Sequence, residues 1–238
     1  MRLSGKSERG KSTKNHDAYF LMGLLHYHLH YLPGFIRFLS SAFIVVGNRE
    51  KGLQELELAA QKGDLLKELA QAELSSAYLN FEKQPANALP FARELNKRFP
   101  KNYNLSFVLG NTLSDLYCYE EASDIAREIE INIQAGNPPF VPYLQPRYNQ
   151  LMGRILFNQG EYDRSMEYFQ SVLKDTSFYN ARPRVWAFVR LGMVNDIYKK
   201  RTQAQEYYLK ALEVEEGEGA AQIEAKKYLK IPYVSAAN

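Results

Sequence analysis

This chain of 238 residues has little cysteine and little net charge. Cys118 is the single cysteine, so no internal disulfide can form. The 30 basic residues face 27 acidic ones, for a net charge of +3. Residues 1–14 hold five of the basic residues and one acidic residue, which leaves 25 basic and 26 acidic residues elsewhere. A nearly neutral body gives no electrostatic basis for binding nucleic acid, and residues 1–15 are expected to form a basic disordered tail.

The chain also lacks an apolar leader and a recognisable catalytic arrangement. Residues 1–15 have no apolar core, so no signal peptide is predicted. The expected location is the cytoplasm by default, or the periplasm or a membrane if the chain is a fragment of a longer protein. No Ser/His/Asp or Cys/His arrangement is suggested, and no serine lies in a nucleophile elbow. We therefore expect neither an enzyme nor a bound cofactor.

Two short motifs near the N-terminus are weak on chemical grounds. The segment Gly5–Ser12 matches the spacing of a phosphate-binding loop, but only four residues precede Gly5, too few for the strand that such a loop requires. His26 and His30 would share one face of a helix, but no nearby carboxylate or cysteine offers a third metal ligand. We predict neither a nucleotide site nor a metal site.

Small residues recur at a fixed offset along the chain. In four places a small residue is followed twelve positions later by another, and apolar residues follow the second member after four and seven positions. The four pairs are Ser76/Ala88, Gly110/Ala122, Gly153/Ser165 and Gly192/Ala204. Such spacing is typical of a repeated helix–turn–helix unit whose two helices approach closely at the small side chains.

This pattern resembles the tetratricopeptide repeat, and the segment from Leu151 to Phe169 matches it best. The resemblance implies an all-α fold, a right-handed superhelix of about five helix pairs with a C-terminal capping helix. Repeats are expected over residues 64–216, and the capping helix and tail over 217–238. Residues 16–63 fit an irregular first repeat, with Gly23 in its first helix and Gly52 in its second.

The irregular repeat contains an apolar insertion, residues 32–47, that an ordinary surface loop would not have. Pro33 and Gly34 interrupt it, which argues against a membrane-spanning helix. Two interpretations remain. The insertion packs on its own repeat as a cap, or it forms a patch for a membrane or a partner. The residues of that patch would be Phe35, Phe38, Phe43 and Val46.

The resemblance also implies where a ligand binds, because the first helices of such repeats line a concave groove. The groove positions so placed are Phe107, Asn111, Ser114, Arg147, Gln150, Arg154, Phe157, Trp186 and Met193. Arg147 and Arg154 suit carboxylates, unless they only solvate the groove or pair with neighbouring acids. The family's clamp for a C-terminal carboxylate is not supported, because Phe107 stands where a lysine is needed and Leu151 where an asparagine is.

The predicted function is a non-catalytic scaffold for protein–protein interaction, binding a peptide or a helix in this groove. The alternative is a membrane-surface or envelope-assembly component that docks through residues 32–47. The sequence does not predict the partner or the oligomeric state.

Overall fold

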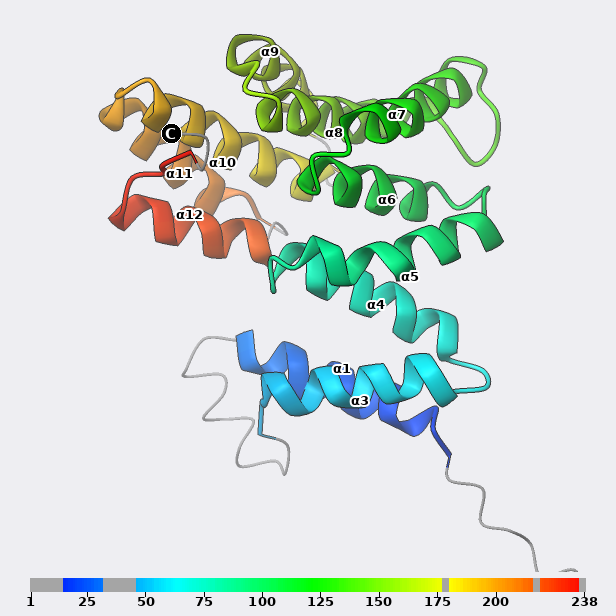
Figure 1. Ribbon diagram of the computed structural model, residues 1–238. Coiled ribbons are helices and arrows are strands. Elements are labelled where there is room, and N and C mark those ends of the chain that lie inside the picture. Colours follow the sequence, from blue (N-terminus) through cyan, green and yellow to red (C-terminus); the bar gives the residue numbers. More distant parts are fainter. Residues whose placement is uncertain (1–14, 32–45, 177–179, 216–218, 236–238) are drawn as a thin grey trace, which may run out of the picture. The chain divides into compact units, whose positions relative to one another are not determined.

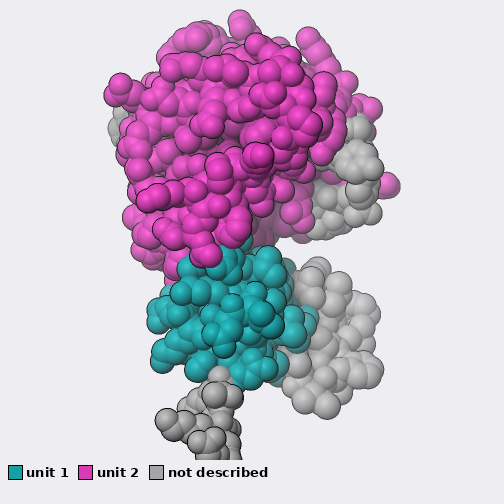
Figure 2. Space-filling view, turned by 90° about the vertical axis from the view of Figure 1, so that its right-hand side faces the viewer, with its two compact units in different colours: residues 1–74 teal, residues 75–238 magenta. Residues whose placement is uncertain are grey.

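The structure is a computed structural model of the chain, and it describes residues 15–31, 46–176, 180–215 and 219–235. Every regular element in these ranges is helical, with eleven α-helices and one short 3-10 helix (Figure 1). The predicted all-α class is therefore confirmed for the described residues. None of their helices is both long and apolar enough to span a membrane. The chain divides into two compact units, residues 1–74 (unit 1) and 75–238 (unit 2), coloured teal and magenta in Figure 2.

Unit 1 is built around one helix pair, α1 (Ala18–Tyr31) and α3 (Arg49–Lys62). A Cβ atom on Gly52 would lie 2.6 Å from the backbone nitrogen of Tyr27, and one on Gly23 would lie 2.9 Å from that of Leu56. These distances leave no room for a side chain, so the two backbones touch where the glycines lie. The two positions that the sequence assigns to the irregular repeat are therefore the contact points of a packed helix pair.

The helix α4 (Lys67–Asn80) begins in unit 1 and contains the boundary between the units. The carboxylate of Asp17 accepts hydrogen bonds from the backbone N–H groups of Asp64, Leu65 and Leu66, at 3.0 to 3.2 Å. These bonds, above all that from Leu66, lower the pKa of Asp17 below its usual value. A negative charge at a helix N-terminus is favourable, so Asp17 joins the start of α1 to the start of α4.

Unit 2 contains the other described helices. In chain order they are α5 (Pro85–Arg98), α6 (Tyr103–Asp115), α7 (Tyr119–Gln134), the 3-10 helix η1 (Pro142–Leu144), α8 (Gln145–Asn158), α9 (Tyr162–Leu173), α10 (Ala181–Ile197), α11 (Arg201–Glu213) and α12 (Ala220–Lys230). Helices that follow one another pack together, as do α6 with α8, α8 with α10, and α10 with α12. Repeat-like packing of consecutive helix pairs produces both sets of contacts.

The small residues of the pattern lie where paired helices meet. A Cβ atom on Gly153 would lie 2.6 Å from the ring of Phe169, and one on Gly192 would lie 2.4 Å from the ring of Tyr208. Both rings are fully buried. Each aromatic residue stands four positions after the second small residue of its pair. In the pairs Gly153/Ser165 and Gly192/Ala204, the offset therefore reflects an aromatic ring of one helix that packs directly on the backbone of its partner.

One turn geometry joins the helices of four successive pairs. Seven positions after each first small residue the backbone φ is positive, at 56°, 61°, 82° and 58° for Lys83, Tyr117, Gly160 and Lys199. In the last three turns the next N–H donates to a carbonyl five residues back, Cys118 to Leu113, Glu161 to Leu156 and Lys200 to Asn195, at 3.0, 2.9 and 2.8 Å. The same turn at the same offset is independent evidence that these pairs repeat one unit.

The last helix, α12, follows Gly219 as the sequence predicts for a C-terminal helix. It lies beside α10 and α11 (Figure 1). Ala221 and Ala225 are its buried residues. Of the apolar insertion, Phe35, Phe38 and Phe43 lie outside the described residues. Val46 is described and is 65% exposed. The predicted basic tail also lies outside the described residues, apart from Asn15.

Candidate functional site

The nine residues predicted to line a groove lie on α6, α8 and α10. Six of them are buried, with 0 to 8% of their surface exposed: Phe107, Ser114, Gln150, Arg154, Phe157 and Met193. The other three, Asn111, Arg147 and Trp186, are half-buried. Most of the predicted positions therefore pack between helices, and Arg147 and Trp186 are the large side chains among them that keep an exposed surface.

Arg147 is held in place by polar and aromatic neighbours. Its guanidinium donates to Oδ1 of Asn104 at 2.7 Å and lies over the ring of Phe107, 4.5 Å from the centroid. A second ring, that of Tyr103, is 5.5 Å away. Burial lowers the pKa of Arg147. Arg147 thus presents a fixed cation on aromatic surface, an arrangement that suits contact with a polypeptide.

Arg154 forms a buried ion pair with Asp115 at the end of α6. Its Nε atom donates to Oδ1 of Asp115 at 2.8 Å, and a second nitrogen donates to Oδ2. The side-chain amide of Asn158 also donates to Asp115, at 3.1 Å. Burial alone would raise the pKa of Asp115, but the charge of Arg154 and these hydrogen bonds outweigh it and hold the pKa below its usual value. The carboxylate that Arg154 was expected to bind is thus supplied by Asp115 of the chain itself, which is the alternative of pairing with a neighbouring acid.

Trp186 stands at the centre of a charged cluster. The cations of Lys83, Arg154 and Arg190 lie 5.1, 6.0 and 5.9 Å from the centroid of its ring. Lys83 also pairs with Glu224 of α12, with 3.2 Å between Nζ and Oε1. We call the group of Lys83, Asp115, Arg154, Trp186, Arg190 and Glu224 the Trp186 cluster. It joins α6, α8, α10, α12 and the turn before α5.

The chain leaves α12 in an extended conformation at Ile231 and then lies against the same helices. The backbone N–H of Tyr233 donates to Oδ2 of Asp196 at 2.8 Å, and its ring lies 5.9 Å from that of Phe157. Two residues later, the hydroxyl groups of Ser235 and Tyr162 are 3.3 Å apart. A short non-helical segment of polypeptide, residues 231–235, is therefore bound by residues of α8, α9 and α10.

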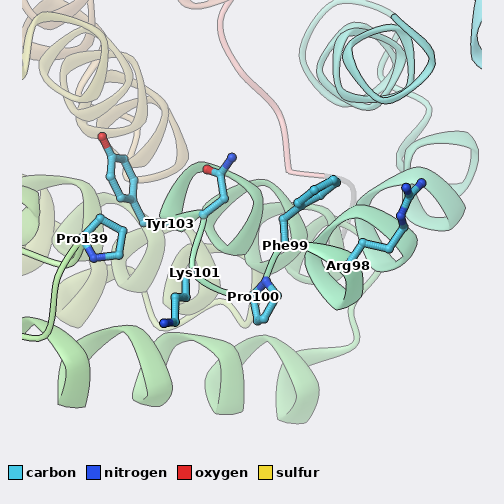
Figure 3. A pocket seen from close by; sticks show the side chains of 7 residues that line it. Arg98, Phe99, Pro100, Lys101, Tyr103 and Pro139 are labelled. Carbon is cyan, nitrogen blue, oxygen red and sulfur yellow. The ribbon is translucent and has the colours of Figure 1, made fainter. Parts of the chain in front are cut away.

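The close-up in Figure 3 shows a separate hollow, of about 590 Å³, at the junction of α5 and α6. Residues 98–103 line it, and Pro139 faces them from the loop after α7. Phe99, 41% exposed, supplies its apolar surface. None of the nine predicted groove residues is among its lining residues.

Of the two histidines considered as metal ligands, His26 pairs with a carboxylate in unit 1, as does the neighbouring His28. Nδ1 of His26 lies 2.6 Å from Glu55, and its Nε2 lies 3.2 Å from Nζ of Lys51. His28 is 2.7 Å from Glu73. The described part of the chain contains no group of three or more side chains placed to hold a metal ion.

Comparison of the chain with protein-family models, with curated proteins and with solved structures found no match. The class of protein is therefore defined by the fold alone, an all-α protein whose consecutive helix pairs pack as repeats. Within this fold, the Trp186 cluster and the segment 231–235 beside it are the features from which a ligand-binding role can be argued.

Proposed function

We propose that the protein is a non-catalytic scaffold whose helix pairs form a tetratricopeptide-like, right-handed superhelix and bind a peptide along their first helices. The repeated turn and the small-residue contacts support the repeat. Repeat arrays of this kind offer extended surfaces that suit elongated ligands. We name the binding face by the residues that flank it, Arg147, Trp186 and Asp196.

The observation that carries this proposal is the segment 231–235. Its backbone donates to a buried carboxylate, and its tyrosine ring packs on Phe157. Main-chain hydrogen bonds provide affinity for any extended peptide, and a pocket for one side chain provides selectivity. The segment therefore acts as an example, within the chain, of the ligand type that this face accommodates.

Selection of peptides from a displayed random library tests the proposal. We expect enriched peptides to bind the intact chain and to lose about tenfold in affinity with Trp186→Ala, because half-buried aromatic residues contribute most at such interfaces. Leu209→Ala is the matched control, since Leu209 is an apolar residue of α11 that is 51% exposed. Fluorescence anisotropy of the resynthesised peptides measures their affinity for each variant, and the helical circular dichroism signal verifies that each variant is folded. Failure to enrich any peptide would contradict the scaffold function, and equal losses with both variants would contradict this face.

A second candidate function is docking on a membrane surface through unit 1. The observation that favours it is the apolar surface of α1, where Leu21, Met22 and Leu25 are 58%, 39% and 47% exposed. Apolar side chains gathered on one short helix are a common feature of association surfaces. Val46, which the sequence assigns to the docking segment, is also exposed.

Flotation with vesicles of phosphatidylcholine, with and without phosphatidylglycerol, tests this candidate. We expect the chain to float with the vesicles and the double variant Leu21→Asp/Leu25→Asp to remain in the dense fraction, because buried carboxylates would oppose insertion. Leu209→Asp in unit 2 is the control and should float like the unaltered chain. If the unaltered chain does not float, the membrane candidate is wrong.

A further inference from the structure

Arg190 is a buried cation without a partner. The residue keeps 9% of its surface exposed, and its Nε atom is enclosed with no hydrogen-bond acceptor. Among the described residues its guanidinium makes no ion pair and no hydrogen bond. A guanidinium has five N–H donors and stays charged at neutral pH. Leaving such a group buried and unpaired is unfavourable, so its retention requires an explanation.

The neighbours of Arg190 do not compensate its charge. It lies over the ring of Phe157, 4.7 Å from the centroid, and beside Trp186. Burial and the like charge of Arg154 lower the pKa of Arg190, and the negative charge of Asp115 opposes them only in part. Asp115 itself is engaged by both Arg154 and Asn158.

Counting charges in the Trp186 cluster gives the size of the imbalance. Its cations are Lys83, Arg154 and Arg190, and its carboxylates are Asp115, paired with Arg154, and Glu224, paired with Lys83. Three positive and two negative charges leave one positive charge, and Arg190 is the cation left over. The adjoining segment 231–235 contains no acidic residue that would balance it.

We propose that Arg190 binds one carboxylate of the peptide ligand, either an acidic side chain or a C-terminal carboxylate. The inference rests on the proposed scaffold function and specifies the chemistry of its ligand. The enclosed Nε leaves the two terminal amino groups of the guanidinium to meet the ligand, and a carboxylate accepts two parallel hydrogen bonds from such a fork. Trp186 and Phe157 form the apolar walls beside it.

The charge balance favours a carboxylate over a phosphate. A carboxylate brings one negative charge and neutralises the cluster. A phosphate monoester carries about −1.5 to −2 charges at pH 7 and would leave an excess of negative charge in a site with little solvent. Inorganic phosphate is therefore a suitable competitor in the test.

Trp186 is the only tryptophan of the chain, so its fluorescence reports directly on this site. The intact chain is titrated to millimolar concentrations with the pentapeptide acetyl-Ala-Val-Glu-Val-Ala-amide, with its glutamine counterpart, and with that counterpart as a free C-terminal acid. We expect a saturable change with the glutamate peptide or the free acid, and at least tenfold weaker binding of the neutral peptide. The two acidic probes distinguish a side-chain carboxylate from a terminal one.

Two variants of Arg190 separate ligand binding from a structural role. Arg190→Lys keeps the charge but loses the fork, and is expected to weaken binding of the acidic peptide about tenfold. Arg190→Met removes an unpaired charge while keeping an apolar side chain of similar length. It is expected to abolish the preference for the acidic peptide. The melting temperature should stay equal or rise, because the substitution removes an unfavourable buried cation.

Three results would overturn the inference: a neutral peptide that binds as tightly as the better of the two acidic probes, no saturable change with either acidic probe, or phosphate that binds more tightly than both. A marked fall in the melting temperature of Arg190→Met would also overturn it, since Arg190 would then be retained for packing on Phe157. These results differ from failure of the scaffold function, which would appear as a library without any enriched peptide.

Discussion

Replacing Gly192 with alanine is expected to lower the free energy of unfolding of unit 2 by about 1 to 2 kcal/mol. The new Cβ atom would lie 2.4 Å from Cε1 of Tyr208, closer than two non-bonded carbon atoms can approach. The ring cannot move aside easily, because it is fully buried and its hydroxyl donates to Asp196 at 2.8 Å. Overpacking costs about 1 to 3 kcal/mol, and the rigid ring places Gly192 in the upper half of that range, whereas the better helix propensity of alanine returns about 1 kcal/mol.

Gly110 provides a matched control on the equivalent position of an earlier pair. A Cβ atom there would meet the two methyl carbons of Leu151, at 3.0 and 3.2 Å, and these are the ends of a flexible side chain. Gly110→Ala is therefore expected to leave the free energy of unfolding within about 0.5 kcal/mol of its original value, since the two effects nearly cancel. Urea titrations followed by circular dichroism measure both variants. Equal destabilisation at the two positions would show that the close contact with the Tyr208 ring is not the reason why position 192 requires glycine.

The helix pairs could be predicted because the residues that contact each other within a pair lie close together in the sequence and recur at a constant spacing. Gly153 and Phe169, or Gly192 and Tyr208, stand sixteen residues apart and meet through one turn, so each pair repeats the same spacing. The turn between the helices of each pair has a weaker signal in the sequence. Only Gly160 has the residue type that its positive φ favours, while Lys83, Tyr117 and Lys199 adopt the same conformation with side chains that disfavour it.

The site was harder to predict because it depends on residues that the chain brings together from a distance. Lys83 and Glu224 belong to opposite ends of unit 2, and nothing near either residue indicates their ion pair. Spacing placed Arg154 and Phe157 on the correct helix, but it did not show that the chain would fill the space around them. One signal was present in the sequence: Arg190 interrupts the apolar residues of α10, between Val189 and Leu191.

Asp196 illustrates how one buried carboxylate joins several of these elements. Its side chain is 1% exposed and accepts hydrogen bonds from Arg201 at 3.0 Å, from the hydroxyl of Tyr208 at 2.8 Å and from the N–H of Tyr233 at 2.8 Å. Burial, then the hydrogen bond to Asp196, raises the pKa of Tyr208 above its usual value, so the phenol stays protonated and donates. Arg201 extends the network to the carbonyls of Tyr228 and Leu229 at the end of α12.

We expect Asp196→Ala to lower the free energy of unfolding of unit 2 by about 3 kcal/mol, the lower end of the cost of breaking a buried ion pair, because Arg201 keeps some solvent contact. Tyr208→Phe is the control, since it removes one hydrogen bond from the same network and should cost about 1 kcal/mol. Urea titration measures both, and limited proteolysis follows the segment 231–235, which should be cleaved faster only in Asp196→Ala. If the two variants were equally destabilised and the segment equally protected, the ion pair with Arg201 would contribute little, and the segment would be held by its aromatic contacts instead.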